Sequence, residues 1–108
     1  MNLAIDYDDT YTKDYPFWQA FIKSAQKRGH TVYCVTWRYT RELVDPELEQ
    51  LVEVCYTGRK AKRPFMEARG ININIWIDDN PLSILKDMEW QQKTTPRATK
   101  QATRMPTT

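Results

Sequence analysis

The chain has 108 residues, which is enough for one domain with a single sheet-centred core but too few for two cores. Hydrophobic residues make up 41% of it, so a packed interior is feasible. No apolar run approaches the roughly 20 residues that a membrane span needs, and no basic segment with an apolar stretch opens the chain. A cytoplasmic protein without a signal peptide is therefore expected.

The small formal net charge of +2 is distributed unevenly. Four of the 16 Lys and Arg residues follow Gln91 without any Asp or Glu, whereas residues 1–90 carry the other 12 bases against 14 acids. Met105 is the only large apolar residue in this last segment. The composition predicts a folded domain over residues 1–90 and a disordered basic tail over residues 91–108. Such a tail is most often an idle solvated end, and less often a weak nucleic-acid contact.

Strand-like and helix-like segments alternate along the first half of the chain. Residues 2–6 form a short apolar run that predicts a strand ending in acids. Residues 15–28 have apolar side chains near helical spacing, with Pro16 suited to a first turn and Gly29 to a stop. Residues 31–36 are β-branched and aromatic, which is typical of a strand.

The same alternation continues through the second half. The expected elements are a helix over 46–51 with Asp45 as its N-cap, a strand over 51–56, a helix over 62–69, a strand over 71–77 and a helix over 81–89 with Asn80 as its cap. Strands separated by helices imply a parallel sheet with right-handed crossovers. The predicted fold class is α/β, a Rossmann-like three-layer sandwich with a mainly parallel sheet of about four strands.

Several conspicuous residues favour a structural role. Cys34 and Cys55 lie in apolar, strand-like runs, so buried reduced thiols are expected rather than a disulfide or a metal site. His30 precedes a strand and is expected in a surface turn. Three tryptophans are expected to pack in or beside the core: Trp18, Trp76 and Trp90.

Polar residues follow each of the four expected strands. Because the carboxyl ends of parallel strands meet at one edge of an open sheet, these residues should converge there. In chain order they are residues 6–10 (Asp-Tyr-Asp-Asp-Thr), 36–38 (Thr-Trp-Arg), 59–63 (Arg-Lys-Ala-Lys-Arg) and 78–79 (Asp-Asp).

This mixture of groups suits phosphoryl chemistry. Clustered carboxylates repel one another, and a hard cation such as Mg²⁺ relieves the repulsion. A lysine, a hydroxyl and backbone N–H groups can then hold a phosphate against the metal. One carboxylate can attack phosphorus while another protonates the leaving oxygen and later activates water.

The four blocks resemble, in order, the four motifs of the haloacid dehalogenase-like phosphohydrolase superfamily. Asp6-x-Asp8-x-Thr10 after an apolar strand is similar to the first motif, and Thr36 at the next strand end to the second. A lysine opening the penultimate helix matches the third motif, and Asp78-Asp79 matches the fourth. The resemblance covers residues 2 to about 88, and all four motifs coincide with strand ends.

The resemblance implies a Mg²⁺-dependent phosphatase that forms an aspartyl-phosphate. It makes Asp6 the nucleophile and a Mg²⁺ ligand, and Asp8 the general acid/base and a ligand through its carbonyl oxygen. It makes Thr36 a phosphoryl-binding residue and gives Asp78 and Asp79 direct or indirect contacts with the metal.

The remaining assignments leave alternatives open. Lys62 opens a helix and fits the third motif, although Lys60 is close enough to replace it. A phosphate- or substrate-binding set completes the site: Asp9, Thr10 and Arg38. Within that set Thr10 is expected mainly to brace the loop, and Asp9 is expected to be solvent-exposed or a local cap rather than a ligand. Arg38, with Trp37, suits a cover for the sheet edge as much as a substrate contact.

No stretch of the chain is long enough for the cap domain that many similar proteins insert, so we expect an open site that suits bulky substrates. The expected partner is a phosphorylated substrate, with nucleotides or nucleic-acid ends as candidates, and the protein is expected to be a monomer or homodimer. The leaving group is expected on an exposed ledge near Trp37, Arg38 and residues 11–15. Transfer of the phosphoryl group to an acceptor other than water is also compatible with these motifs. The alternative function is a non-catalytic phosphate- or nucleic-acid-binding module. Taken alone, Asp78-Asp79 would also suit a pair of residues that caps a helix N-terminus.

Overall fold

The computed structural model describes residues 1–88 and contains one sheet of four parallel strands in the order β3-β2-β1-β4. The strands are β1 (Asn2–Ile5), β2 (Thr31–Thr36), β3 (Glu53–Tyr56) and β4 (Ile75–Ile77). The helices are η1 (Tyr11–Lys13, a 3₁₀ helix), α1 (Tyr15–Lys27), α2 (Pro46–Leu51), α3 (Lys62–Ala68) and α4 (Leu82–Leu85). The predicted α/β class and parallel four-stranded sheet are confirmed, and the described residues include no cap domain.

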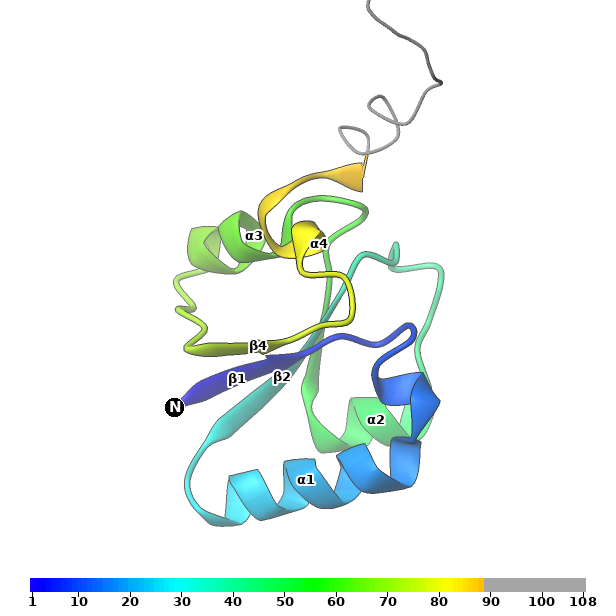
Figure 1. The fold of residues 1–108 in the computed structure, drawn as a ribbon, viewed down its shortest axis with the longest axis vertical. Coiled ribbons are helices and arrows are strands. Elements are labelled where there is room, and N and C mark those ends of the chain that lie inside the picture. The colour runs from blue at the N-terminus through cyan, green and yellow to red at the C-terminus, as the bar shows by residue number, and fades with distance from the viewer. Residues whose placement is uncertain (89–108) are drawn as a thin grey trace, which may run out of the picture.

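The sheet forms the middle of three layers. Figure 1 shows α1 and α2 on one face and α3 and α4 on the other. Because side chains alternate along a strand, β1 directs Leu3 and Ile5 to one face and Ala4 to the other. The first core packs against α1 and α2 and includes Ile22 and Leu48, while the second packs against α3 and includes Met66.

The strand register brings the ends of β1, β2 and β4 to one edge of the sheet. Ile5 on the central strand β1 lies opposite Cys34 on β2 and Ile77 on β4. The N–H of Asp6 continues the ladder by donating to the carbonyl oxygen of Ile77 at 2.9 Å. The chain passes from β1 outward to β2 and β3, and then returns to the other side of β1 with β4. Asp6 therefore lies where the strand order reverses, which is the usual ligand position in open parallel sheets.

The predicted strands over 51–56 and 71–77 are shorter in the structure. β3 begins at Glu53 because Leu51 still belongs to α2. β4 includes only the last three residues of the alternating 71–77 run. Ile71 and Ile73 pack against the second core but do not belong to a strand. The segment before β4 is held to Asn2 by side-chain hydrogen bonds: the N–H of Asn2 donates to the side chain of Asn74, and the side chain of Asn2 donates to the carbonyl oxygen of Asn72.

The last helix also differs from the prediction, because α4 ends at Leu85 and the backbone of Lys86 is extended. Asn80 does not cap α4 with its side chain. Instead its own N–H donates to Asp78 Oδ1 at 2.9 Å, and its carbonyl oxygen accepts from the N–H of Ser83 at 3.0 Å. The predicted N-cap of α2 is confirmed, since the Asp45 side chain accepts from the N–H of Glu47.

The residues assigned to packing are found in that role where the structure describes them. Cys34 and Cys55 are buried free thiols, and burial raises the pKa of Cys55 to about 11, which keeps it protonated. Trp18 and Trp76 are partly buried against the two cores. His30 lies in the link before β2, where its Nδ1 is 2.9 Å from the N-terminal amino group. Trp90 and the predicted tail over residues 91–108 lie outside the described residues, as do the ends of the predicted 1–90 domain and 81–89 helix.

No helix within residues 1–88 is long and apolar enough to cross a membrane.

Candidate functional site

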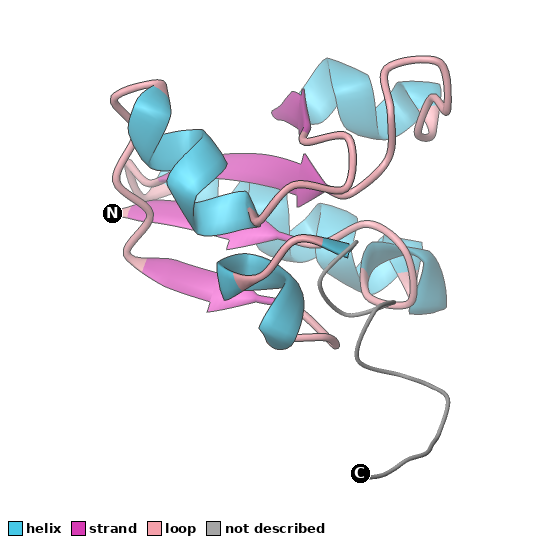
Figure 2. Ribbon diagram, turned by 90° about the horizontal axis from the view of Figure 1, so that it is seen from above, coloured by secondary structure: helices cyan, strands magenta, loops and turns pink. Residues whose placement is uncertain are grey.

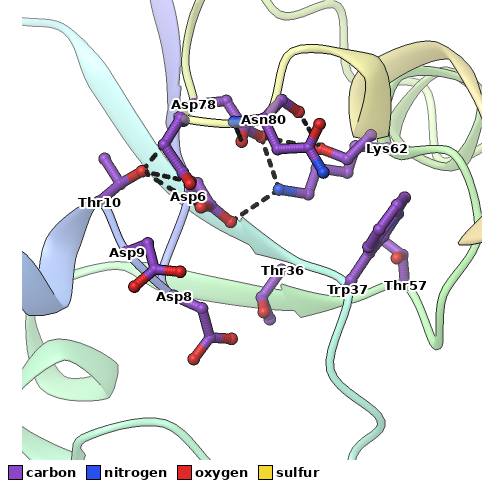
Figure 3. A network of polar contacts seen from close by, with 12 residues as sticks. Asp6, Asp8, Asp9, Thr10, Thr36, Trp37, Thr57, Lys62, Asp78 and Asn80 are labelled. Carbon is purple, nitrogen blue, oxygen red and sulfur yellow. Dashed lines mark hydrogen bonds and ion pairs between the residues drawn. The ribbon is translucent and has the colours of Figure 1, made fainter.

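A buried lysine joins two carboxylates at the centre of the carboxyl edge. Lys62 Nζ lies 2.7 Å from Asp6 Oδ1 and 2.6 Å from Asp78 Oδ2 (Figure 3). The three residues come from different elements, since Asp6 follows β1, Lys62 opens α3 and Asp78 follows β4. Only 2% of the Lys62 side chain is exposed, whereas Lys60 is an exposed residue. The structure therefore places Lys62, and not Lys60, against the predicted nucleophile.

Thr10 ties the loop after β1 to the loop after β4. Its hydroxyl lies 3.2 Å from Asp6 Oδ2 and 3.0 Å from Asp79 Oδ1, so it donates to one carboxylate at a time. The same oxygen accepts from the N–H of Asp79 at 3.2 Å. This is the bracing contact expected of Thr10, and it holds the carboxylates of Asp6 and Asp79 on one side of the site.

The carboxylates of Asp6, Asp78 and Asp79 can each offer an oxygen atom to a common ion, with all three oxygens within 4.8 Å of one another. Burial raises the pKa of Asp6 to about 7, although Lys62 opposes the change, and the neighbouring Asp79 and Asp78 raise it further. The pKa of Asp79 is lowered, first by its hydrogen bond with Asp6 and also by the Thr10 hydroxyl. Ionised, the three acids outweigh Lys62 by two charges, so this oxygen donor set fits a divalent cation such as Mg²⁺.

Asp8 lies beside this cluster and is held by Arg38. Figure 3 shows its carboxylate pointing away from Asp6. Arg38 Nε and Nη2 donate to the two carboxylate oxygens at 3.0 and 2.8 Å, and the pair is partly exposed, 30% for Arg38 and 54% for Asp8. This bidentate contact raises the pKa of Arg38. The Asp8 side chain is not part of the three-acid cluster, and a predicted role for it in metal binding rests on its carbonyl oxygen.

Arg38 also organises the loop after β2. Its Nη1 donates to the carbonyl oxygens of Glu42 and Leu43 at 3.3 and 3.1 Å, and its guanidinium lies 4.9 Å from the centre of the Tyr7 ring. Arg38 is therefore fixed by one carboxylate and by two carbonyl groups.

Thr36 ends β2 beside Asp6 and is almost completely buried. Its hydroxyl oxygen accepts from the N–H of Arg38 at 3.2 Å. The O–H is then still able to donate to another acceptor, which is what a phosphoryl-binding hydroxyl requires.

A cavity of about 310 Å³ opens over these groups. Besides the four acids Asp6, Asp8, Asp78 and Asp79, its wall includes Lys62 and the exposed Asp9, whose φ of 62° places it in a tight turn of the loop after β1. Five further residues line the cavity that were not predicted to belong to the site, or for which a packing role was equally expected: Trp37, Arg59, Asn80, Ser83 and Met88. The hydroxyl of Ser83 is 3.2 Å from Asp78 Oδ2. This contact could have been predicted from the sequence, because Ser83 lies five residues after Asp78, on the first turn of the next helix.

The segment after α4 closes one wall of this cavity. The Asp87 carboxylate accepts from the N–H of Ala61 at 2.6 Å, directly before Lys62, and the N–H of Met88 donates to the carbonyl oxygen of Arg59 at 2.9 Å. These two bonds connect distant segments whose pairing has no local sequence signature, and they fix the loop that leads into α3.

Comparison with known proteins gave no match, whether with protein-family models, with curated proteins or with solved structures.

The structure thus brings most of the predicted residues to one edge of the sheet, with three differences in detail. Thr36 is 1% exposed and does not line the cavity. Arg38 reaches the site only through Asp8 and does not line the cavity. Tyr11, expected on the exposed ledge for the leaving group, is instead 1% exposed and packs in the first core. That part of the ledge prediction is wrong, because the η1 turn folds Tyr11 inward while Tyr15 stays exposed.

Proposed function

We propose that this chain is a Mg²⁺-dependent phosphatase of the haloacid dehalogenase-like type, which hydrolyses a phosphomonoester through an aspartyl-phosphate on Asp6. The observation that carries the proposal is the contact of Lys62 with both Asp6 and Asp78, beside Asp79, at the carboxyl edge of the sheet. Lys62 contacts two carboxylates, and the carboxylate of Asp79 lies within 4.8 Å of both.

The proposed cofactor, Mg²⁺, would be held by Asp6, Asp78 and Asp79, together with the carbonyl oxygen of Asp8. It would supply positive charge to the phosphate oxygens next to Asp6.

The protein's own groups carry out the two chemical steps. Lys62 orients the Asp6 carboxylate and offsets the charge of the incoming phosphate, and the Thr36 hydroxyl donates to a phosphoryl oxygen. A carboxylate oxygen of Asp6 forms a bond to phosphorus while the bond to the ester oxygen breaks, and that oxygen takes a proton from Asp8. Water then attacks the aspartyl-phosphate, Asp8 accepts its proton, and Asp6 and inorganic phosphate are released.

The second candidate is a non-catalytic phosphate- or nucleic-acid-binding module, and the Arg38–Asp8 pair favours it. The Asp8 carboxylate is held by both donors of the Arg38 guanidinium and points away from Asp6. It must therefore leave Arg38 to reach a substrate oxygen. Both side chains are partly exposed, so water can replace the contacts that this rotation releases. We therefore favour the enzyme.

A phosphatase screen separates the two candidates. Nucleotides, sugar phosphates, phosphopeptides and phosphorylated oligonucleotides are incubated with the full chain in Mg²⁺ or in EDTA, and released phosphate is measured. Activity that needs Mg²⁺, is absent in Asp6→Asn and persists in Asp45→Asn supports the enzyme. Asp45→Asn is the matched control, because Asn also serves as an N-cap and Asp45 lies at the start of α2 outside the cavity. Phosphate binding without turnover of any compound would support the module instead.

A further inference from the structure

An apolar groove lies between one flank of α1 and the strand β4, apart from the acidic cavity. β4 lies at one edge of the sheet, which Figure 2 shows face-on between its two layers of helices, and within residues 1–88 it pairs with β1 alone. Ile75 and Ile77 line the groove from β4, and Phe21 and Ala25 line it from α1, around a volume of about 430 Å³. Ile75 is 44% exposed, so α1 leaves this part of the sheet uncovered.

The groove continues into a row of side chains along the same flank of the helix. We define this row as the α1 stripe: Asp14, Phe17, Trp18, Phe21, Ser24, Ala25 and Arg28. Its members recur at intervals of three, four and seven positions, which places them on one side of a helix with 3.6 residues per turn.

Three aromatic rings form the apolar part of the stripe. Phe17 is 57% exposed, and its ring meets that of Trp18 edge to face with the centroids 4.9 Å apart. Trp18 meets Phe21 in the same way at 5.6 Å. Because Phe21 also lines the groove, the rings and the groove form one continuous apolar surface.

The two ends of the stripe carry opposite charges. Asp14, the N-cap of α1, and Arg28, its C-cap, are both exposed, and within residues 1–88 neither side chain forms an ion pair. One carboxylate oxygen of Asp14 accepts from the N–H of Phe17 at 3.3 Å, which leaves the other able to accept from a cation. Lys23 and Lys27 fall on a different side of the helix by their spacing, so the stripe itself has one acid and one base.

These charges are complementary when two copies of α1 lie antiparallel. Asp14 and Arg28 are each seven residues from Phe21, which is about 10 Å along the helix axis. With Phe21 at the centre of the pair, the acid of one copy therefore meets the base of the other at both ends. A parallel pair would instead place like charges together.

The sizes of the side chains match in the same arrangement. By the same count of residues, Phe17 of one copy lies opposite Ala25 of the other, beside the groove. Trp18 lies opposite Ser24, so each of these large rings faces a small side chain. The exposed Phe17 ring thus has a groove of its own kind of surface to enter.

The segment that follows Met88 is a poorer occupant of the groove. Met88 is bonded to Arg59 at the acidic cavity, and Figure 1 shows the end of the described chain beside α3 and α4, on the face of the sheet opposite to α1. Beyond Met88 the sequence has two large apolar residues, Trp90 and Met105. A partner for the groove needs more apolar surface than these provide.

We propose that a second copy of this chain covers the α1 stripe, in a dimer whose twofold axis passes beside Phe21. Each copy inserts Phe17 into the groove of the other, and two Asp14–Arg28 ion pairs close the ends. Burial of the rings supplies the affinity, and the ion pairs fix the antiparallel register. A contact along one short helix is at the small end of interface sizes, so the dimer is reversible. The proposal does not depend on the phosphatase, because no residue of the stripe lines the acidic cavity.

The test measures self-association of the full-length chain by sedimentation equilibrium, from about 1 µM to about 1 mM protein. Phe17→Ser removes the inserted ring, and Arg28→Glu places two acids together at each end. Leu43→Ser is the matched control, because Leu43 is also an exposed apolar side chain, at 65%, but lies in the loop after β2. Circular dichroism spectra check that the variants keep the fold.

The wild-type chain should show a monomer–dimer equilibrium with a Kd on the order of 10 to 100 µM. Phe17→Ser and Arg28→Glu should each weaken the dimer at least about tenfold, and Leu43→Ser should leave the Kd within about twofold of wild type.

A mixture of two charge variants tests the register. Asp14→Lys places two cations together at each end and should dimerise as poorly as Arg28→Glu. In a heterodimer of these two chains both ends again pair an acid with a base, so the mixture should associate within about threefold of wild type. Arg28→Glu leaves the N-cap intact and remains informative if loss of the cap unfolds Asp14→Lys.

A wild-type chain that stays monomeric over the whole concentration range would overturn the proposal. A dimer that Phe17→Ser and Arg28→Glu weaken no more than Leu43→Ser does would overturn it too, since the contact would then lie elsewhere. The same holds for a mixture of folded charge variants that associates no better than either component. If truncation after Gln92 creates a dimer that the full chain lacks, the segment after Met88 occupies the groove and the proposal is wrong.

Discussion

Lys62 Nζ and Asp6 Oδ1 lie 2.7 Å apart although 56 residues separate them in the chain. Each is more than nine-tenths buried, and Lys62 also contacts Asp78. A buried cation between two acids is costly to maintain unless all partners are present. The contact therefore connects the folding of α3 to the alignment of the proposed nucleophile.

Lys62→Met should reduce phosphatase activity about 10²- to 10³-fold, because a preorganised charge at the reacting phosphate is lost. The matched control Lys23→Met removes an exposed lysine on α1 and should keep full activity. Initial rates with a small phosphomonoester measure the effect. Near-normal rates in Lys62→Met would remove this residue from the catalytic set.

Asp6→Asn should abolish turnover with the fold intact, since an amide cannot form the phosphoenzyme. Asp8→Asn should slow turnover by about 10²-fold or more, the usual scale for loss of a general acid/base. Steady-state rates and circular dichroism spectra of both variants check this. If Asp6→Asn stays active, the nucleophile is another residue.

Mg²⁺ should raise the melting temperature of the wild-type chain. Binding to the folded state stabilises it by about 2.7 kcal/mol when the free ion is at 100 times its Kd, and for a domain of this size that is a shift of roughly 10–20 °C. Asp79→Asn, which removes one of the three clustered carboxylates, should lose most of the shift. Calorimetry in MgCl₂ against NaCl of equal ionic strength tests this, and a shift of equal size in wild type and Asp79→Asn argues against the cluster as the metal site.

Arg38→Ala should lower the free energy of unfolding by about 1–2 kcal/mol, because the Asp8 pair and the bonds to two carbonyl groups are lost together. Arg38→Lys should recover little, since an ammonium group cannot reproduce the bidentate contact. Urea unfolding gives the values. Arg63→Ala is the control, because it breaks only an exposed ion pair with Glu67 and should change the free energy of unfolding by less than about 0.5 kcal/mol. An equally small effect of Arg38→Ala would contradict the role of Arg38 in holding the loop after β2.

Truncation after Gln92 should leave the melting temperature almost unchanged, because Met105 is the only large apolar side chain that is removed. A thermal scan of the two chains under identical conditions is sufficient. A marked decrease would show that the segment packs on the domain or on a second copy.

The sequence alone determined the order of strands and helices and the position of each polar block. Hydrophobic periodicity and turn residues are local signals, which is why α1, β2 and α2 start at the predicted residues and why the acids follow β1 and β4. The convergence of those blocks could also be predicted, because parallel strands place their carboxyl ends together.

Only the tertiary structure decided which groups meet within that edge. The choice of Lys62 over Lys60 depends on the direction in which the first turn of α3 faces the sheet. The Arg38–Asp8 pair and the bonds of Asp87 and Met88 to the loop before α3 join segments 26 or more residues apart. Such contacts depend on how whole helices, strands and loops pack together, and no periodicity in the sequence predicts them. The inward Tyr11 has the same origin, since burial against neighbouring elements overrides the local pattern.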